Sequence, residues 1–399
     1  MANSLRHTYH FIAAKVGANM TNGWKQLHWG QTPWRIDFHP QAISFPQSVD
    51  FAVVGGGFTG LSAAAELRRI DPNKTVAVLE AESVGARSSG HTGGLVLAET
   101  ASGDLPGLGD VLAGYSSVLR NLKVDADISL PGAWELDRTS RLENSPILWS
   151  DSGQLRVARE VQGGTADPGK IVSGLAHAAE RHGALVFEGA RVDRIDFDDP
   201  LTLHVSRKRI RAQRVLIATN SESLEISGLV GRAEPKFTLA LATEPVQENK
   251  LAAIGLASGK PFYTVDLPYL WGRLLHGNQI IFGSGLVSLD NWRELAALDI
   301  GAGEAFELLA RLKKRVSGLH PALADVHFSH EWGGPILIAE QWRPVFARHT
   351  ASDRAIVLGA YSGHGVALSV YLGAWAAEVL LGRRDLPNWS SGWASSETF

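Results

Sequence analysis

The stretch that decides the fold is DFAVVGGGFTGLSAAAELRRIDPNKTVAVLE, residues 50–80. It opens with a short apolar run of strand length and continues into three glycines in G-x-G-x-x-G spacing, Gly55, Gly57 and Gly60. A helix-periodic segment and a second apolar strand follow, and that strand ends at Glu80. Strand, glycines, helix, strand and acid in this order predict a βαβ unit that binds a dinucleotide.

Each part of this unit has a physical role. Gly55 allows the tight turn from strand to helix, Gly57 lets the backbone approach a pyrophosphate, and Gly60 lets the helix pack closely on the strand. The unpaired N–H groups at the start of the helix then face the phosphates. Glu80 lies 20 residues beyond Gly60, where a carboxylate can accept a hydrogen bond from a ribose hydroxyl.

Composition narrows the class of protein. The chain has 399 residues, 45% of them hydrophobic, and a net charge of −3, which suits two domains or one large elaborated domain. No basic excess favours nucleic acid or an anionic membrane surface as a partner. Because there is no cysteine, disulfides, Cys-ligated metals and a thioether link to a cofactor are excluded.

No segment has the pattern of a signal peptide or of a transmembrane helix. The longest apolar stretch, 366–381, is short for a span and carries Ser369, Gly373 and Glu378. We therefore expect a soluble cytoplasmic protein. No residue spacing typical of a metal site occurs, and we expect no metal.

Dinucleotide-type segments recur at three places, and we expect them to form one cofactor domain from 48–97, 165–225 and 331–385. The segments between them carry antiparallel β-patterns and are expected to form a substrate domain from 98–164 and 226–330. Residues 1–47 form a predicted N-terminal arm and 386–399 a C-terminal tail. Three tryptophans of the arm are expected to be packing anchors, with a partner or subunit contact as the alternative: Trp24, Trp29 and Trp34.

Two glycine-rich loops favour FAD over NAD as the dinucleotide. The first, AESVGARSSGHTGGLVL, residues 81–97, permits close backbone approach to a bulky ligand. The second, residues 361–365, precedes a long apolar helix whose N-terminal N–H groups can stabilise anionic reduced flavin by roughly 0.3–2 kcal/mol. A long cofactor held at both ends, with no second nucleotide fingerprint in the chain, is typical of FAD.

The chain resembles the D-amino-acid oxidase superfamily of FAD enzymes, and within it the gamma-glutamylputrescine oxidase-like amine oxidoreductases. The resemblance spans about residues 48–385. It rests on VVGGGFTGLSAA, VLEAESVGARSSGHTGG, DPGKIVSGLAHAAERHGALV, VLIATN, TEPV at 243–246, and WGGPI…RPVF with GAYSGHGVALS.

This resemblance implies an α/β fold, in which a glutathione-reductase-like Rossmann domain binds FAD. An inserted α+β substrate domain would roof the flavin with an antiparallel sheet. The implied reaction oxidises the C–N bond of a small amine or amino-acid-like substrate by hydride transfer to flavin N5, and oxygen or another carrier accepts the electrons.

From the motifs and the resemblance we expect FAD to contact Gly55, Gly57, Phe58, Thr59, Gly60, Glu80, Ala81, Arg87, Ser88, Ser89, His91, Thr92, Gly93, Gly94, Val192, Thr219, Gly363, His364, Gly365 and Val366. His91 matches a position where some relatives, resembling dimethylglycine dehydrogenase, bind flavin covalently through histidine. Putrescine-type relatives usually have arginine there. Covalent attachment, contact without a covalent bond, and no contact all stay open for His91.

Four residues are candidates for the catalytic centre: Arg273, Trp332, Tyr361 and His364. We expect Trp332 and Tyr361 to form aromatic pocket walls, with ordinary core packing as the alternative. We expect His364 to contact the flavin edge or the substrate, or else to bond backbone.

Two arginines are candidates for binding a substrate carboxylate. Arg273 lies on the presumed substrate sheet, where its guanidinium could clamp a carboxylate or form a surface ion pair, and Arg343 is the second candidate. Relatives that oxidise amino acids often carry an arginine where this chain has Gly333-Gly-Pro335, which weakens the case for a simple α-amino acid. Some oxidase relatives use a lysine above the flavin, and 279–285 contains none, so oxygen is a doubtful acceptor.

Two other functions stay open at this point. An NAD(P)H-dependent flavin monooxygenase or hydroxylase shares the FAD domain with a single fingerprint. A non-catalytic flavoprotein subunit could bind FAD, or a partner through the tryptophan-rich arm. No nucleic-acid partner is expected, and a homo-oligomer is compatible with the sequence.

Overall fold

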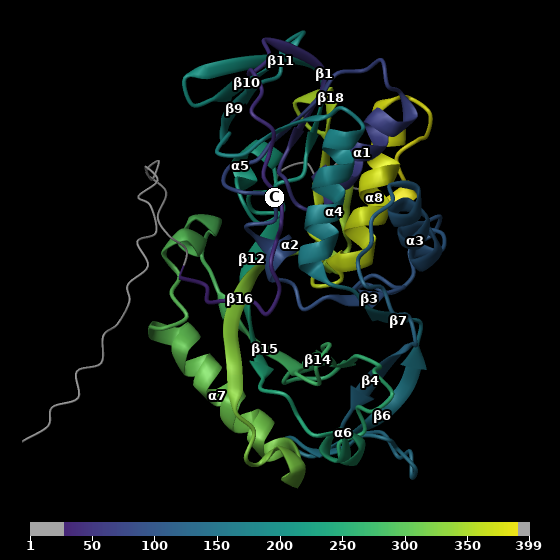
Figure 1. Cartoon of the computed structure of the whole chain (residues 1–399). Coiled ribbons are helices and arrows are strands. Elements are labelled where there is room, and N and C mark those ends of the chain that lie inside the picture. Colours follow the sequence, from purple (N-terminus) through teal and green to yellow (C-terminus); the bar gives the residue numbers. More distant parts are fainter. Residues whose placement is uncertain (1–27, 390–399) are drawn as a thin grey trace, which may run out of the picture.

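The computed structural model describes residues 28–389, which are organised around two large β-sheets (Figure 1). The first sheet contains, in spatial order, β17 (Val345–His349), β18 (Ser352–Gly359), β11 (Lys208–Ile217), β1 (Ser48–Val54), β2 (Val76–Leu79) and β8 (Leu185–Phe187). From β18 to β8 all neighbours run parallel, so we call it the parallel sheet. Two strands extend a meander from β11, namely β9 (Val192–Asp196) and β10 (Leu201–Val205).

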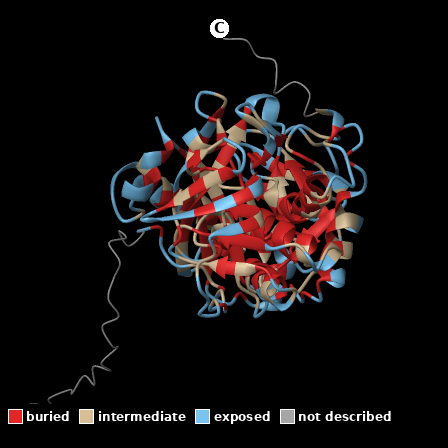
Figure 2. Cartoon of the chain, turned by 90° about the horizontal axis from the view of Figure 1, so that it is seen from above, coloured by how far each residue is buried: buried red, intermediate tan, exposed pale blue. Residues whose placement is uncertain are grey.

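The central strands of the parallel sheet are apolar on both faces because both faces are covered. In β1, Phe51 and Val53 face one hydrophobic cluster, and Ala52 and Val54 face another. Helices pack over the first face, namely α1 (Phe58–Ile70), α3 (Val111–Asn121), α4 (Pro168–Arg181) and α8 (Gly365–Leu380), as Figure 1 shows. The meander covers the other face. Figure 2 shows buried residues concentrated inside these layers.

The second sheet carries the opposite half of the molecule. Its order is β16 (Phe328–Ala339), β12 (Ala233–Thr243), β15 (Ile280–Ser288), β14 (Trp271–Leu274), β13 (Phe262–Thr264), β4 (Ala133–Asp137), β6 (Gln154–Val161) and β5 (Leu148–Ser150). All its pairs are antiparallel except β13 with β4, and we call it the antiparallel sheet. Helix α7 (Gly303–Leu319) packs against one face through Leu309 and Leu312.

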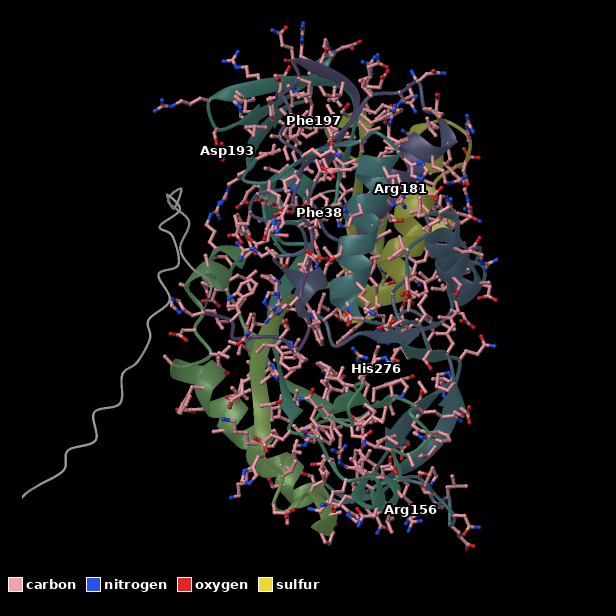
Figure 3. All side chains as sticks on the ribbon, in the orientation of Figure 1. Phe38, Arg156, Arg181, Asp193, Phe197 and His276 are labelled. Atoms are coloured by element: carbon pink, nitrogen blue, oxygen red, sulfur yellow. The ribbon has the colours of Figure 1, made fainter. Side chains whose placement is uncertain are left out.

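Short elements connect these layers. The remaining strands form a small sheet of their own, β3 (Leu95–Leu97) with β7 (Gly163–Thr165), and the remaining α-helices are α2 (Ser88–His91), α5 (Leu224–Ser227) and α6 (Glu248–Ala253). Three 3₁₀ turns cover Trp292–Ala297, Pro321–Leu323 and Glu340–Trp342. Figure 3 places Phe197 and Asp193 beside the meander and Arg156 at the far end of the molecule, on β6. Across residues 28–389, no helix is both long and apolar enough to cross a bilayer.

The predicted fold class is confirmed, and local signals explain parts of it. Asp167 caps α4, because its side chain accepts a hydrogen bond from the Lys170 amide at 3.0 Å, and Pro168 occupies the first turn. Gly60 lets α1 approach the turn closely, since a Cβ there would lie 2.0 Å from the Gly55 carbonyl oxygen.

The element positions differ from the predicted domain division in two places. Helix α3 lies in the segment predicted for the substrate domain, yet it packs against α8 and buries Tyr115 and Leu119 there. Strand β16 opens the last predicted cofactor segment, yet it pairs along its length with β12 in the antiparallel sheet. Both differences have the same cause. The sequence shows that α3 and β16 have apolar faces, but it does not show which element covers them.

The described part of the arm is packed through its tryptophans. Trp29 is 1% exposed and donates its indole N–H to Leu295 O at 3.1 Å, and the Trp34 indole donates to Gly90 O at 2.8 Å. Gly30 bridges to Trp332, which places the arm along β16. Trp24 and the tail residues 390–399 lie outside the described residues.

Candidate active site

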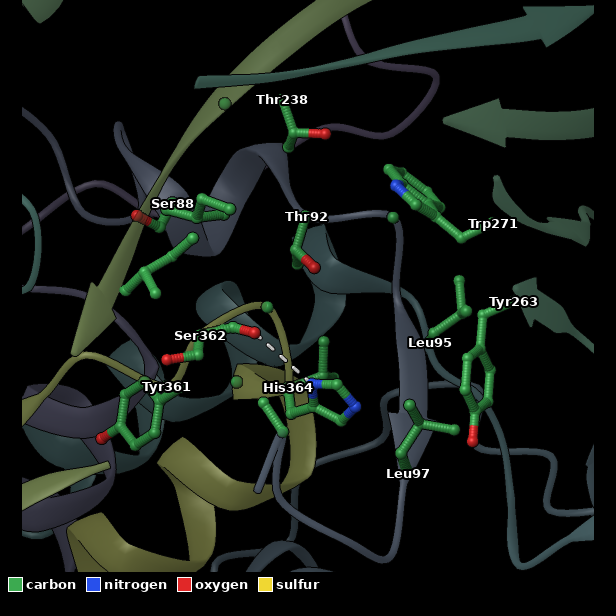
Figure 4. Close-up of a pocket in the computed structure, with 18 of the residues that line it drawn as sticks. Ser88, Thr92, Leu95, Leu97, Thr238, Tyr263, Trp271, Tyr361, Ser362 and His364 are labelled. Atoms are coloured by element: carbon green, nitrogen blue, oxygen red, sulfur yellow. Dashed lines mark hydrogen bonds between the residues drawn. The ribbon is translucent and has the colours of Figure 1, made fainter. Parts of the chain in front are cut away.

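A cavity of about 630 Å³ lies where the glycine loops of the parallel sheet meet one face of the antiparallel sheet. Small-molecule sites usually have volumes of roughly 300–1,000 Å³. Figure 4 shows Tyr361, Ser362 and His364 on one side of it, with Tyr263 and Trp271 opposite. The carboxyl ends of the strands of a parallel sheet are where doubly wound folds bind ligands.

Many of the predicted residues meet at this cavity, and those that line it are Gly57, Phe58, Thr59, Ser88, Ser89, His91, Thr92, Gly93, Tyr361, Gly363, His364, Gly365 and Val366. The other predicted residues lie outside its lining, and they are Gly55, Gly60, Glu80, Ala81, Arg87, Gly94, Val192, Thr219, Arg273 and Trp332. Val192 lines a separate cavity of about 160 Å³. We call the wall formed by Gly57–Thr59, Ser88, Ser89 and the loop Tyr361–Gly365 the cofactor end.

The start of α1 shows why the glycines are spaced as they are. Gly55 has φ +108°, and a Cβ there would lie 2.6 Å from the Ala218 carbonyl oxygen, so it is fixed by the backbone turn. Gly57 instead faces Ser89, whose hydroxyl oxygen would lie 2.8 Å from an added Cβ. That hydroxyl accepts the Phe58 amide at 3.0 Å. The helix start therefore presents amide groups and a serine to the cavity, which is a site suited to phosphate.

The second glycine loop is held by a residue that the sequence analysis did not select. Ala360, Ser362 and Gly363 all have positive φ, and the Asn220 side chain fixes this turn by accepting the Ala360 amide at 2.9 Å. Asn220 also donates to the Ser88 hydroxyl at 3.1 Å, which ties the two loops together. The predicted residue, Thr219, follows the end of β11 at Ile217 and is absent from the cavity lining, whereas Asn220 is part of it. The sequence did contain a signal for Asn220, because the apolar run VLIATN finishes on the polar residues Thr219 and Asn220.

Glu80 and Arg87 lie behind the cofactor end. Glu80 accepts the Gly56 and Glu82 amides at 2.7 and 2.9 Å, and burial raises its pKa. Arg87 binds Glu82 at 2.8 Å and lies over the Trp29 ring. Arg87 Nε also lies 3.6 Å from Glu222 Oε1. Three buried polar atoms, Arg87 Nη1, Thr219 Oγ1 and Ser221 Oγ, have no hydrogen-bond partner, and their residues lie outside the cavity lining.

His91 lies at the cavity wall with one ring nitrogen already engaged. Its Nδ1 is 3.0 Å from Arg87 O, and its ring makes an edge contact with Trp29 at 5.5 Å between centroids. Burial lowers its pKa, so the imidazole is neutral near pH 7. Any covalent bond to a flavin would therefore use Nε2.

Two predicted catalytic residues take structural positions instead. Trp332 is 0% exposed, packs against Trp34 at 5.5 Å between ring centroids and donates its indole N–H to His91 O at 3.1 Å. Because the arm covers Trp332, its side chain supports the loop at His91 from behind and does not line the cavity. Arg273 is 6% exposed, and its Nε donates to Gly93 O at 2.6 Å.

Desolvation lowers the pKa of Arg273 to about 10. Its guanidinium holds the loop Gly93–Gly94 from outside the cavity, which corrects the expected carboxylate clamp. Arg343 is exposed and also lies outside the cavity lining.

The cavity wall also carries four polar side chains that sequence reasoning missed, and one of them, Tyr263, contacts the His364 ring. We call this group the polar end, and it consists of Glu99, Glu135, Arg159 and Tyr263. Arg159 donates to both Glu135 oxygens at 2.9 and 2.6 Å. The single proton of the Tyr263 hydroxyl can be donated to Glu99, at 3.1 Å, or to Glu135, at 3.2 Å. No local motif marks these residues, since three different strands and a loop supply them.

Tyr361 and His364 connect the cofactor end to the rest of the cavity. The Tyr361 hydroxyl lies 2.7 Å from Thr59 Oγ1, and burial raises its pKa, so it stays protonated. His364 precedes α8, and its ring makes an edge contact with Tyr263 at 6.5 Å between centroids. Burial lowers the pKa of His364 and keeps it neutral. Within the described chain, no group of three or more potential ligands could hold a metal ion.

The comparisons with known proteins agree with this geometry. The family model described as FAD dependent oxidoreductase matches residues 50–162 and 119–379. The chain belongs to this family. The oxidoreductase is 27% identical to a probable oxidoreductase OrdL of Rhizobium meliloti, over 86% of this chain and 87% of that protein. It is 25% identical to the gamma-glutamylputrescine oxidoreductase of Escherichia coli, over 84% of each chain. The resemblance given by the motifs is thereby confirmed.

Solved structures confirm the fold. Glycine oxidase from Geobacillus kaustophilus superposes with a TM-score of 0.69 at 17% identity, over 89% of this chain and all of that chain. L-proline dehydrogenase from P. horikoshii gives 0.68 at 18% identity, over 87% and 97% of the two chains. At these identities the similarity concerns the fold alone.

The protein is a FAD-dependent enzyme, and the residues present fit the cofactor. The backbone at Gly363 is open to the cavity, since a Cβ there would meet nothing within 4 Å, and Gly57 lines the cavity without a side chain. The starts of α1 and α8 both face the cavity, so their amides can hold anionic groups.

Proposed function

We propose that the enzyme oxidises the C–N bond of a small amine. A hydride leaves the carbon beside the nitrogen, the nitrogen loses a proton, and water hydrolyses the imine to a carbonyl compound and the released amine or ammonia. Bound FAD supplies the acceptor for the hydride and passes the electrons to oxygen or a carrier. The name of one similar protein, a gamma-glutamylputrescine oxidoreductase, supports an amine substrate.

The observation that carries this proposal is a single cavity that joins the cofactor end to the polar end. A substrate between them touches the cofactor on one side and polar side chains on the other. The protein's task is then to orient the amine and exclude water, because hydride transfer needs close and aligned reacting atoms. His364, at the cofactor end, makes an edge contact with Tyr263 of the polar end, and its neutral imidazole can accept a hydrogen bond from the substrate N–H.

The test is an anaerobic screen of amines and amino acids for bleaching of the flavin absorption band. We expect a primary or secondary amine to bleach it at a rate that rises with pH across the substrate's own pKa, because only the neutral amine has the lone pair that assists hydride loss. Fast bleaching by NADPH without any amine would instead assign a monooxygenase. A flat rate with bound substrate would contradict the proposed C–N oxidation.

A further inference from the structure

Neighbouring strands of the antiparallel sheet place one row of side chains on the cavity wall. Tyr263 pairs with Trp271 on one side and with Glu135 on the other, and Glu135 pairs with Arg159. Directly paired residues project from the same face of a sheet. All four line the cavity, and Glu99 joins the row through the Tyr263 hydroxyl.

The charges in this row do not balance. Arg159 forms a two-pronged ion pair with Glu135 and reaches Glu99 only at 3.4 Å. Two carboxylates against one guanidinium leave one net negative charge at the polar end. Glu135, which Arg159 already balances, is buried, whereas the side chain of Glu99 is 26% exposed, and Leu95, Leu97 and Leu270 line the cavity beside this row. A partly shielded carboxylate without a full counter-charge attracts a ligand cation more strongly than it would in bulk water.

The polar end also lacks a free cationic side chain that could bind an anion. Among the described residues that line the cavity, Arg159 is the one arginine and there is no lysine, and Glu135 already engages that arginine. The Tyr263 ring stands beside the carboxylates instead, and Trp271, which pairs with Tyr263, also lines the cavity. Aromatic faces and carboxylates together are the chemistry that binds ammonium groups.

We propose that the polar end binds a second protonated nitrogen of the substrate, so that the enzyme acts on diamines or related polyamines. Glu99 is the main counter-ion, because Arg159 neutralises it less than it neutralises Glu135, and Tyr263 and Trp271 flank the cation. This inference rests on the proposed C–N oxidation and names its substrate class. The reacting nitrogen is the other one, at the cofactor end.

The experiment compares three matched series at equal chain length on the FAD-loaded enzyme: α,ω-diamines, the monoamines and the ω-amino acids. We expect the diamine of the best length to exceed its monoamine by roughly 10-fold or more in kcat/KM, with the ω-amino acid poorest, because an opposite charge pair in a partly buried site contributes at least this much. Bleaching by none of them would reject the proposed function itself. Bleaching by monoamines with no preference for diamines would reject only the present inference.

Variants test whether Glu99 causes the preference for diamines. Glu99→Gln keeps the shape and removes the charge, so the diamine-to-monoamine ratio of kcat/KM should fall roughly 10-fold, mainly through KM. Glu99→Lys should invert the preference toward the ω-amino acid. Glu160→Gln is the matched control, because Glu160 follows Arg159 on β6, pairs with Lys260 at 2.6 Å and is absent from the cavity wall. Equal losses on all three series in Glu99→Gln, or a diamine preference that survives Glu99→Lys, would overturn the assignment.

Discussion

At the cofactor end of the cavity the contacts come from backbone amides, glycines and small hydroxyls, whereas at the polar end they come from long charged side chains. At the cofactor end, the start of α1 is tightly packed, since an added Cβ at Gly57 would lie 2.8 Å from the Ser89 hydroxyl oxygen. The polar end is built from cross-strand pairs of long side chains. We expect the start of α1 to tolerate no added volume, and the polar end to tolerate isosteric changes that alter charge.

The strongest test of this contrast is Gly57→Val. The added side chain would displace the Ser89 hydroxyl from the Phe58 amide and enter the path of the pyrophosphate. FAD binding should weaken by roughly 100-fold or more, which is about 2.7 kcal/mol. The measurements are the flavin content of purified protein and titration of the apoprotein with FAD.

Gly318→Val is the matched control, because Gly318 lies exposed on α7 with nothing within 4 Å of an added Cβ. It should keep full flavin content. A Gly57→Val protein that is as yellow as the control would show that the α1 turn does not hold the cofactor.

Arg273 tests whether the antiparallel sheet positions the cofactor loop. Arg273→Ala removes a charged hydrogen bond to Gly93 O and leaves a gap beside Gly94, so the free energy of unfolding should fall by about 2 kcal/mol. FAD affinity should fall as well. Because the guanidinium lies outside the cavity lining, kcat/KM should fall by the same factor for carboxylated and uncharged amines.

The exposed Arg343 provides the control, since Arg343→Ala should leave unfolding and flavin content unchanged. A selective loss on carboxylated substrates in Arg273→Ala would restore the carboxylate clamp that the sequence suggested.

The contrast between the cofactor end and the polar end also explains which site residues the sequence could predict. Gly57, Ser89 and Gly363 were predictable because each stands in a local motif whose chemistry depends on spacing along the chain. Glu135, Arg159 and Tyr263 were not, because they meet only through strand register, and β13 pairs with β4 across more than a hundred residues of sequence. Trp332 was misplaced for a related reason. Trp332 lies on β16 of the antiparallel sheet, opposite Ala240, but the arm carrying Trp34 covers its side chain.

His91 gives a smaller test of the cofactor end. We expect acid precipitation of the enzyme to release all flavin into the supernatant, because the ring is held by Arg87 O and packed against Trp29. His91→Gln should shift the flavin spectrum and slow turnover by a few-fold, roughly the effect of one neutral hydrogen bond of about 1 kcal/mol. Flavin retained in the pellet would show covalent attachment, and an unchanged spectrum and turnover would place His91 away from the flavin.

The smallest expected effect is a dependence of stability on pH. Burial lowers the pKa of both His91 and His364 below the ordinary value of 6.5. Between that value and the lower folded-state values, the unfolded chain binds protons that the folded chain does not. The stabilisation from these two histidines is therefore full above about pH 6.5 and is lost as the pH falls below it. In this pH window, each histidine can change the free energy of unfolding by at most about 1.4 kcal/mol per pH unit.

Glu80 and Glu222 act in the opposite sense, because burial raises their pKa values and their contribution falls as the pH rises above 4.5. We therefore compare the free energy of unfolding of the wild type with that of the double variant His91→Gln/His364→Gln, because the contributions of Glu80 and Glu222 are common to both and cancel. Denaturant unfolding of the holoenzymes at a series of pH values from 5 to 8 should show curves that run parallel above pH 6.5. Below it the wild type should lose stability faster than the variant. Parallel curves over the whole range would mean that both histidines titrate alike in the folded and unfolded chain, and that burial at the cavity wall does not hold them neutral.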